Sequence, residues 1–396
     1  MKLTVAIPTI AGREKYLHAS LKTCVSQDVD ELEILVSDNS AERGAQAVVE
    51  QFDDSRIRYI SPPAYVPMAK HWDFVVANVS GDAFTIIGDD DGLMPGCAQR
   101  VLDLLKQHGL CPIHHSLCNY FWPDFSDKTR RNRIHFSHTS DGLTTVVDGD
   151  GMFRKLCQAK ARYFDGPMVY HNFIPTALVR SLTHDGVFFR RAAPDVYSSV
   201  ALSAACSSYL STSEYLTLSG QSSQSTGNAV RLGTKVGQAY MTEMQADFRP
   251  RFMSQTVQFA LLDAIYEVVE TYNRSDMLDD INVAAHLYRA VMEVRSIVGA
   301  DKKVKELSRL GLTALKNKVM TKTTAYLAER VLRRMGKTSS KIAIYHAPSS
   351  VTCDASVTDI YAASMFLYSY LNGTSTVARA GDQLPVMAAG SCHTSL

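Results

Sequence analysis

Apolar residues follow two alternating patterns along the first hundred positions. Short uninterrupted apolar runs, typical of buried strands, alternate with segments in which apolar residues recur every three or four positions, which is typical of helices. The predicted strands are 3–9, 31–38, 56–60 and 83–87, and the predicted helices are 13–26, 45–52 and 70–79. Strands that alternate with helices need crossover connections, so we predict an α/β fold with a mixed, mainly parallel sheet flanked by helices.

The pattern changes twice in the rest of the chain. Loops dominate from about residue 111 to 220, with strand-like MVYHNF (168–173) and TALVRS (176–181) among them, and a Ser/Gly-rich stretch follows at 218–227. Apolar residues then return at helical spacing in 252–272 and 283–298. We therefore predict one domain over 1–227, with halves 1–110 and 111–227, and a mainly helical C-terminal region over 228–396.

Three polar clusters follow three of the predicted strands. They are Pro8-Thr9, Asp38-Asn39 and the triplet Asp89-Asp90-Asp91 in FTIIGDDDGLMPG. Ligands of parallel sheets bind outside the carboxyl ends of the strands, so we expect the clusters to share one ligand site.

The aspartate triplet follows a run that reads as a buried strand. Three adjacent carboxylates repel one another there unless a cation or good hydration offsets their charge. Oxygen ligands without thiolates suit Mg²⁺ or Mn²⁺. The alternative is a solvated acidic turn, or a cap for a helix that begins near Pro95; the strand before the triplet and the neighbouring polar strand ends favour the metal site.

Composition limits the class of protein. The chain has 396 residues, is 46% hydrophobic and 20% charged, and its net charge of +1 gives no general reason to expect nucleic acid as a partner. Its eight scattered cysteines include no C-x-x-C pair, which fits a reducing compartment. We see no signal peptide and no apolar run of transmembrane length, so we predict a cytoplasmic protein.

Three segments together resemble a known family. VAIPTIAGREKYLHASLKTCVSQ, LEILVSDNS and the strand leading into GDDDGLMPG resemble glycosyltransferase family 2, over roughly residues 1–227. The resemblance implies the GT-A fold and an inverting transfer of sugar from a nucleotide-sugar donor, such as a UDP-sugar, assisted by Mn²⁺ or Mg²⁺. It further implies a glycan or lipid-linked acceptor and a role in cell-surface polysaccharide synthesis.

The resemblance also assigns roles to residues. Pro8, Thr9 and Arg13 would line the nucleotide pocket, and Asp38 would accept a hydrogen bond from the base, in a turn shaped by Asn39 and Ser40. Asp89 and Asp90 would lie near the ribose and diphosphate, and Asp91 would coordinate the metal. Carboxylates are acceptors suited to imide and hydroxyl donors.

Inversion needs a general base for the acceptor hydroxyl. The family places an acidic residue about a hundred positions after its metal motif, and Asp195 lies 104 positions after Asp91. Asp195 also follows Pro194 at the start of an apolar helical run, so a plain helix cap is the alternative. Asp185 is the second candidate for the base, and His184 beside it reads as a loop residue.

The chain departs from the common family pattern in YVPMAKHW (65–72). Lys70 stands there in place of the usual residues, and we expect it to contact the diphosphate. Residues 219–227 read equally well as a loop that closes over the donor or acceptor and as a linker.

Other functions fit less well. PTIAGRE is a poor match to the phosphate loop of a sugar-nucleotide pyrophosphorylase, and no Walker A motif is present. A non-catalytic sugar-nucleotide-binding or scaffolding subunit stays open as the alternative.

A basic stretch lies in the C-terminal region. Residues 301–341 hold twelve Lys or Arg against three acidic residues, about +9. The stretch reads either as a peripheral contact with an anionic membrane surface or as a pair of ordinary packed helices.

Overall fold

The computed structural model describes residues 1–136, 141–232, 234–248, 251, 256–295 and 349–373. The basic stretch 301–341, with its proposed membrane contact, lies outside the described residues. Within them, no helix has the length and apolar character needed to cross a bilayer.

The predicted parallel sheet is confirmed. Its strands run in the order β3-β2-β1-β4-β9. They are β1 (Leu3–Thr9), β2 (Leu32–Asp38), β3 (Ile57–Ile60), β4 (Ala83–Ile86) and β9 (Ile174–Pro175). The first four pair in parallel, and β9 joins β4 antiparallel.

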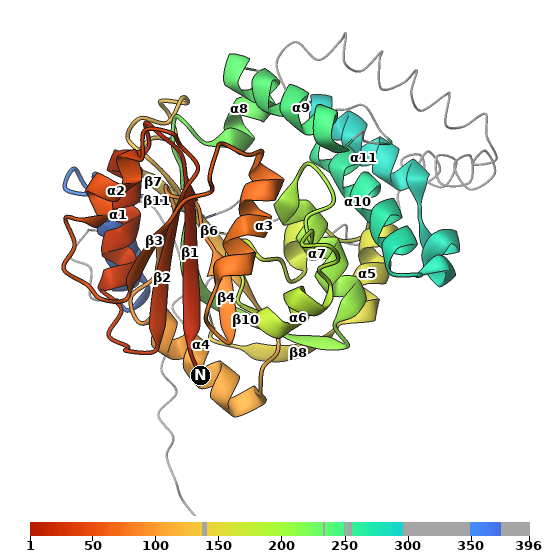
Figure 1. The fold of residues 1–396 in the computed structure, drawn as a ribbon, viewed down its shortest axis with the longest axis horizontal. Helices are drawn as coiled ribbons and strands as arrows, with labels where there is room; N and C mark the ends of the chain where they lie inside the picture. The colour runs from red at the N-terminus through yellow and green to blue at the C-terminus, as the bar shows by residue number, and fades with distance from the viewer. Residues whose placement is uncertain (137–140, 233, 249–250, 252–255, 296–348, 374–396) are drawn as a thin grey trace, which may run out of the picture.

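Helices cover both faces of this sheet, as predicted (Figure 1). Successive side chains of a strand point to opposite faces. Leu3, Val5 and Ile7 of β1 accordingly pack with α1 (Glu14–Val25), α2 (Gly44–Val49) and α4 (Cys97–His108), whereas Ala6 packs with α3 (Met68–Asn78). The alternation along β1 therefore produces two separate cores.

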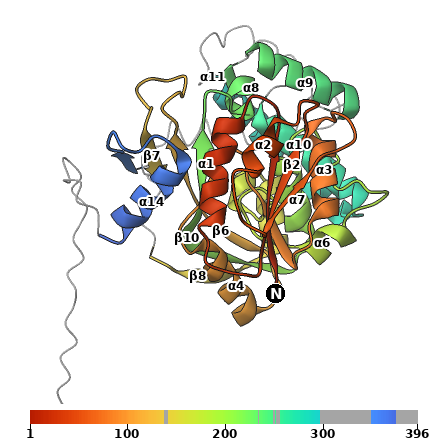
Figure 2. The ribbon, with the colours of Figure 1, turned by 60° about the vertical axis from the view of Figure 1, so that its left-hand side comes forward.

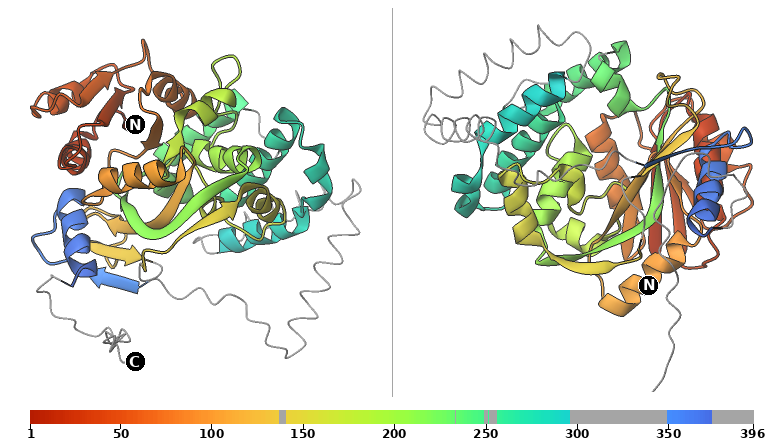
Figure 3. Two further views of the ribbon diagram at one scale, coloured as in Figure 1. Left: turned by 90° about the horizontal axis from the view of Figure 1, so that it is seen from below. Right: turned by 180° about the vertical axis from the view of Figure 1, so that it is seen from behind.

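A second sheet lies behind the first, in the order β11-β7-β6-β10-β5, with β8 also paired to β10 (Figure 3). Its strands are β5 (Gly92–Leu93), β6 (Ile113–Phe121), β7 (Arg133–Phe136), β8 (Thr144–Asp148), β10 (Ser208–Gln221) and β11 (Ser349–Thr352). The long strand β10 pairs in parallel with β6. The strand β11 and the helix α14 (Ile360–Leu371) thus bring the described end of the chain back onto the N-terminal half, where α14 packs in one core with Tyr16 of α1.

Two strand-like segments of the sequence behave differently in the structure. TALVRS forms the helix α6 (Thr176–Ser181), because the strand β9 ends at Pro175 and the following Val179 turns into the core. MVYHNF makes only isolated bridges, Tyr170 with Ile86 and Phe173 with Ile113. It therefore runs as an irregular connection between the two sheets.

A helical layer completes the molecule. It contains α5 (Gly149–Cys157), the short 3₁₀ helices η1 (Tyr163–Asp165) and η2 (Ser275–Asp280), α7 (Pro194–Ala205), α10 (Val257–Thr271) and α11 (Val283–Arg295). Helices from both sides of residue 227 share one core, since Val200 and Leu262 belong to the same cluster. The domain boundary near 227 stays a prediction.

Two helices follow β10 along the edge where β1 ends. Figures 1 and 2 show α8 (Thr226–Leu232) and α9 (Lys235–Phe248) above the sheet, at the end opposite the N-terminus. The first parallel strands all end at this edge, so α8 and α9 border the predicted ligand site.

The strand β10 reaches the aspartate turn through a glycine. A Cβ atom on Gly220 would lie 1.7 Å from the carbonyl oxygen of Asp90 and 2.7 Å from Nε1 of Trp122. Trp122 donates a hydrogen bond of 3.0 Å to that same carbonyl. Only a residue without a side chain allows this approach, since both obstructing groups are fixed.

We expect Gly220→Ala to lower the free energy of unfolding by on the order of 2–3 kcal/mol, because the added methyl pushes β10 away from the aspartate turn. Urea denaturation measures the change. Gly227→Ala is the matched control, since a Cβ there meets no atom within 4 Å. Equal stability of the two variants would contradict the close approach.

Two buried histidines should make stability depend on pH. Burial lowers the pKa of His71 to about 4 and that of His115 to about 3, against about 6.5 in an unfolded chain. The unfolded chain therefore binds more protons below pH 6.5, so stability is full above that pH and falls as the pH drops toward 4.

Each histidine should remove on the order of 1 kcal/mol per pH unit in this window. Urea denaturation at pH 7 and pH 5.5 measures the slope. His71→Gln keeps a polar group near Ser37, whose hydroxyl lies 2.8 Å from His71 Nε2, and should flatten the slope. A slope identical to that of the wild type would rule out His71 as a source.

Candidate active site

The predicted polar clusters meet at one edge of the sheet. Thr9, the last residue of β1, donates a hydrogen bond of 2.6 Å to Asp89 in the turn after β4. Asn39, just after β2, donates its backbone N–H to the Thr9 carbonyl at 2.9 Å. Pro8 is half-buried in β1 and lies beside Ser37 of β2. The expectation that three strand ends converge therefore holds in the structure.

Arg13 is the cation at the centre of this edge. Its Nε donates to both carboxylate oxygens of Asp89, at 2.7 and 2.8 Å, and its Nη2 lies 3.2 Å from Asp90. Burial alone would lower the pKa of Arg13, but the two carboxylates outweigh burial and raise that pKa. Its Nη1 donates to the Gln224 carbonyl at 2.7 Å. Arg13 thus joins the triplet to the loop after β10.

Asp90 is the carboxylate with the least charge compensation. Burial raises its pKa to about 6; Arg13 opposes this shift, whereas Asp91 and Asp89 add to it. Its Oδ2 accepts hydrogen bonds from the hydroxyls of Ser222, at 2.6 Å, and Ser225, at 2.8 Å. Two neutral hydroxyls offset little of the charge, so Asp90 is the member of the triplet that gains most from an added cation.

Asp91 is fully buried and held on all sides by the protein. Its carboxylate accepts from the backbone N–H of Gly88 at 2.6 Å, the N–H of Gly220 at 2.7 Å and the Tyr170 hydroxyl at 2.5 Å. Nε2 of His171 lies 3.2 Å away. Burial would raise the pKa of Asp91, but His171 and Tyr170 outweigh burial and lower it. The carboxylate therefore acts as an anchor between the aspartate turn, β10 and the 168–173 connection.

The arrangement bears on the predicted metal ligand. The described residues contain no group of three or more His, Cys, Asp or Glu side chains placed to hold a metal. One or two carboxylates with water and phosphate oxygens are enough for Mg²⁺ or Mn²⁺, and the donor set around Asp90 fits that chemistry. Asp91 would first have to release four contacts, so its role as the ligand stays a prediction and the geometry favours Asp90.

The polar side chains at the end of β2 also have hydrogen-bond partners within the protein. Asp38 is buried, and its Oδ1 accepts from Ser40 N at 3.0 Å, while its Oδ2 accepts from the Tyr59 hydroxyl at 3.1 Å. Asn39 exchanges two hydrogen bonds with the backbone of Val66, at 2.7 and 3.0 Å. These contacts fix the turn; the predicted contact of Asp38 with a base stays a prediction.

The predicted base comes from the other half of the predicted domain, at the start of α7. Asp195 is in the first turn of α7, and burial raises its pKa, which a hydrogen bond from the Tyr163 side chain opposes. Tyr170, which donates to Asp91, also interacts electrostatically with Asp195. Tyr170 therefore interacts with the charges of both Asp91 and Asp195.

The second candidate for the base is placed less favourably. Asp185 is exposed, with φ of 53°, in the turn closed by the His184–Val187 bridge. His184 is a loop residue, as expected. This turn lies near the start of the 182–193 segment, whereas Asp195 follows the end of that segment.

Lys70 contacts a second helix in this structure. Its side chain is 57% exposed on α3, and its Nζ lies 3.2 Å from Asp247 of α9. The neighbouring Tyr65 hydroxyl contacts Glu243 of the same helix at 3.1 Å. Lys70 therefore holds α9 against α3 in this structure, and its contact with a diphosphate stays a prediction.

Several residues of the site were not predicted from the sequence. They are Tyr163, Tyr170, His171, Gly220, Ser222 and Ser225. The Ser/Gly-rich composition of 218–227 did mark the loop after β10, but no spacing connects Ser222 to Asp90, which lies 132 positions away.

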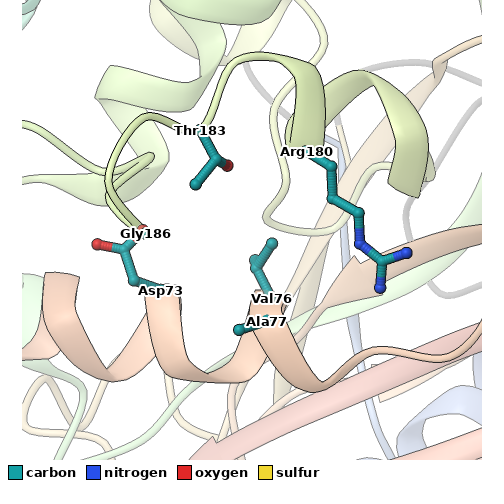
Figure 4. A pocket seen from close by; sticks show the side chains of 6 residues that line it. All are labelled: Asp73, Val76, Ala77, Arg180, Thr183 and Gly186. Atoms are coloured by element: carbon teal, nitrogen blue, oxygen red, sulfur yellow. The ribbon is translucent and has the colours of Figure 1, made fainter.

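A separate cavity of about 240 Å³ lies between α3 and the 180–186 segment (Figure 4). Its two charged residues stand on opposite sides and already have partners. Asp73 accepts from the backbone N–H of Phe188 and Phe189, and Arg180 donates to the Val79 carbonyl. None of the predicted site residues lines this cavity, which leaves the strand-end cluster as the candidate site.

The chain is similar to known glycosyltransferases. The sequence profile of "Glycosyl transferase family 2" matches residues 4–155. The GalNAc(5)-diNAcBac-PP-undecaprenol beta-1,3-glucosyltransferase of Campylobacter jejuni is 32% identical over 104 residues, which are 26% of this chain and 33% of the relative. The match thus spans about a third of that relative's length.

Two solved structures illustrate the structural comparison, both with TM-scores under 0.5. S. aureus TarS 1–349 in complex with UDP-GlcNAc has a TM-score of 0.42 and 13% identity, over 90% of this chain and 98% of that one. The mannosyltransferase PcManGT from Pyrobaculum calidifontis, in complex with GDP-Man and Mn²⁺, has a TM-score of 0.40 and 14% identity, over 85% and 88%.

The profile match covers β1, β2 and the aspartate triplet, which are the segments that carry the strand-end cluster. The resemblance seen in the sequence is thereby confirmed over this segment: residues 4–155 match glycosyltransferase family 2.

Proposed function

We propose that this protein is an inverting, metal-dependent glycosyltransferase. It moves a sugar from a nucleotide-diphosphate sugar, most simply a UDP-sugar, to a hydroxyl group of a glycan or lipid-linked acceptor. The observation that carries the proposal is the buried triplet Asp89–Asp91 with Arg13 at the strand ends.

Arg13 is suited to the donor diphosphate. A guanidinium held rigidly in a buried, polar environment binds anionic oxygens in a fixed orientation. Here Asp89 fixes the orientation of Arg13, and Nη1 contacts only a backbone carbonyl, which a phosphate oxygen can replace. A divalent cation held beside Asp90 would supply Lewis-acid stabilisation of the departing diphosphate.

Asp195 is suited to proton removal from the acceptor. Burial raises its pKa from the usual range of an aspartate, and a raised pKa makes a carboxylate a stronger base. Tyr163 donates to the carboxylate and so fixes its direction. The charged form of Asp195 is the active one, because it accepts the hydroxyl proton as the anomeric bond forms on the opposite face from the leaving diphosphate.

The acceptor is inferred from the curated relative. Its name describes a glucosyltransferase whose acceptor is a glycan linked through diphosphate to undecaprenol. We extend this acceptor class to the present chain, as part of cell-surface polysaccharide synthesis.

We expect UDP or GDP to bind more tightly with Mn²⁺ than without it, and Asp90→Asn to remove at least about tenfold of that gain, since a neutral amide is a weaker cation ligand. Isothermal titration calorimetry measures both affinities. Asp28→Asn, at an exposed site in the loop between α1 and β2, is the control and should behave as wild type. Equal nucleotide affinity with and without Mn²⁺ in the wild type would exclude the metal role.

We expect Asp195→Asn to lower turnover by about two to four orders of magnitude, the usual scale of general-base catalysis, with nucleotide affinity unchanged.

We expect Tyr163→Phe to change the pH dependence of kcat/KM. The hydrogen bond from Tyr163 lowers the pKa of Asp195; without it that pKa rises, so the acidic limb of kcat/KM moves to higher pH.

The groups around Asp195 make this test specific. Tyr163 from η1, Tyr170 from the 168–173 connection and Tyr240 from α9 all interact with its charge. Tyr272→Phe is the control, because the Tyr272 hydroxyl contacts Tyr197 and the Leu182 carbonyl instead. A Tyr163→Phe profile that overlays the wild type, or an Asp195→Asn variant with normal turnover, would remove the assignment.

A further inference from the structure

Three side-chain oxygens from distant parts of the chain form a compact triangle. Asp90 Oδ2 lies 2.6 Å from Ser222 Oγ and 2.8 Å from Ser225 Oγ, and the two hydroxyl oxygens are 3.4 Å apart. Neighbouring ligand oxygens around an octahedral cation with metal–oxygen distances of 2.0–2.1 Å are separated by about 3 Å. The triangle therefore has the dimensions of one face of such a coordination shell.

The three oxygens also have suitable chemistry. Serine and threonine hydroxyls coordinate Mg²⁺ in nucleotide-binding phosphate loops. A hydroxyl oxygen has two lone pairs beside its proton. Ser225 Oγ accepts one hydrogen bond from the Ser222 N–H at 2.9 Å, and Ser222 Oγ accepts one from the Gln224 N–H at 3.3 Å, so each serine keeps one lone pair for a cation. Ser222 is only 1% exposed, so the surrounding protein encloses its hydroxyl.

The charge around the triangle favours a cation. Arg13 faces the Oδ1 side of Asp90, at 3.2 Å, and its closest contacts are with Asp89. His171 and Tyr170 are directed to Asp91. Within the described residues, the Oδ2 side of Asp90 therefore contacts the two serine hydroxyls and no positively charged side chain.

The loop that carries the serines is held at several points. The N–H of Ser223 donates to Asp124 at 3.2 Å, and Asp124 in turn accepts from Lys15 and the Tyr16 hydroxyl. Arg13 donates to the Gln224 carbonyl at 2.7 Å. The hydroxyls of Ser222 and Ser225 are therefore positioned by the rest of the site before any ligand binds.

We propose that Ser222 and Ser225 are cation ligands and that, together with Asp90, they form the protein's share of a Mg²⁺ or Mn²⁺ site. Water and the donor's phosphate oxygens fill the other positions. The proposal rests on the proposed function, which it deepens by assigning the loop after β10 to the metal.

A purely structural role for the two serines predicts the opposite change in Mn²⁺ affinity when their hydroxyls are removed. If the serines only cover Asp90, a cation must displace them, and their removal makes the carboxylate easier to reach. Loss of Mn²⁺ affinity on removal of the hydroxyls therefore supports ligation, and unchanged or increased affinity contradicts it.

The experiment measures Mn²⁺ binding to the full-length protein by electron paramagnetic resonance of free Mn²⁺, in the presence of saturating UDP. We expect Ser222→Ala/Ser225→Ala to weaken Mn²⁺ binding by about tenfold or more, since two of three protein ligands are lost. Ser223→Ala, in the same loop but exposed and directed toward Tyr16, should leave Mn²⁺ affinity unchanged.

A change of metal preference provides a second test, which does not require the alanine variant to fold. Ser225→Cys places a soft sulfur in the site, so we expect Cd²⁺ to gain affinity relative to Mg²⁺. A hydroxyl that only donates to Asp90 would give no such exchange of preference, and an unchanged Cd²⁺/Mg²⁺ ratio would overturn the proposal.

UDP binding in EDTA separates this proposal from the proposed function. The double alanine variant should bind UDP without metal as the wild type does. A wild type that binds no nucleotide at all would contradict the glycosyltransferase proposal, whereas normal nucleotide binding with serine-independent Mn²⁺ affinity would overturn only the ligand assignment.

Discussion

The burial of the Asp91 carboxylate is the constraint on which the site depends. A buried, ionised carboxylate is costly unless hydrogen bonds and opposite charge surround it. Asp91 obtains hydrogen bonds from Gly88 in its own turn, Gly220 on β10 and Tyr170 between the sheets, and Nε2 of His171 lies 3.2 Å from its carboxylate. Because these donors come from three segments, satisfying one charge fixes the relative positions of the parallel sheet, the second sheet and the connection between them.

The three aspartates consequently have different roles despite their adjacency. Asp89 pairs with Arg13 and Thr9, and Asp91 is enclosed by backbone and aromatic donors. Asp90 is left with hydroxyl partners and a raised pKa. The protein thus compensates two of the three charges internally and leaves the third with weaker partners, which is the reason for placing the proposed cation beside Asp90.

The sequence predicted the parts of this site that depend on local pattern. Alternation of strands and helices predicted the parallel sheet, and the positions of Thr9, Asp38 and Asp89 at strand ends predicted their convergence. The sequence could not separate Asp90 from Asp91, because adjacent residues differ only in the direction that the folded turn gives them. It could not place Lys70 either, since the partner Asp247 belongs to a helix 177 positions away. TALVRS suited a strand by composition, and only the end of β9 at Pro175 made it a helix.

The long separations within the site bear on how the protein is made. Asp91 and Gly220 are 129 positions apart, and Arg13 contacts the Gln224 carbonyl across 211 positions. Contacts between residues so far apart in the sequence form late in folding, because a long loop must close before they can stabilise the folded state. On the ribosome, the acidic turn leaves the exit tunnel well before β10 and its serines have been synthesised. A nascent chain that ends near residue 155 therefore contains the whole family-matched segment but lacks Tyr170, His171 and Gly220, which surround the Asp91 carboxylate in the folded protein, so Asp91 stays hydrated until translation has passed β10.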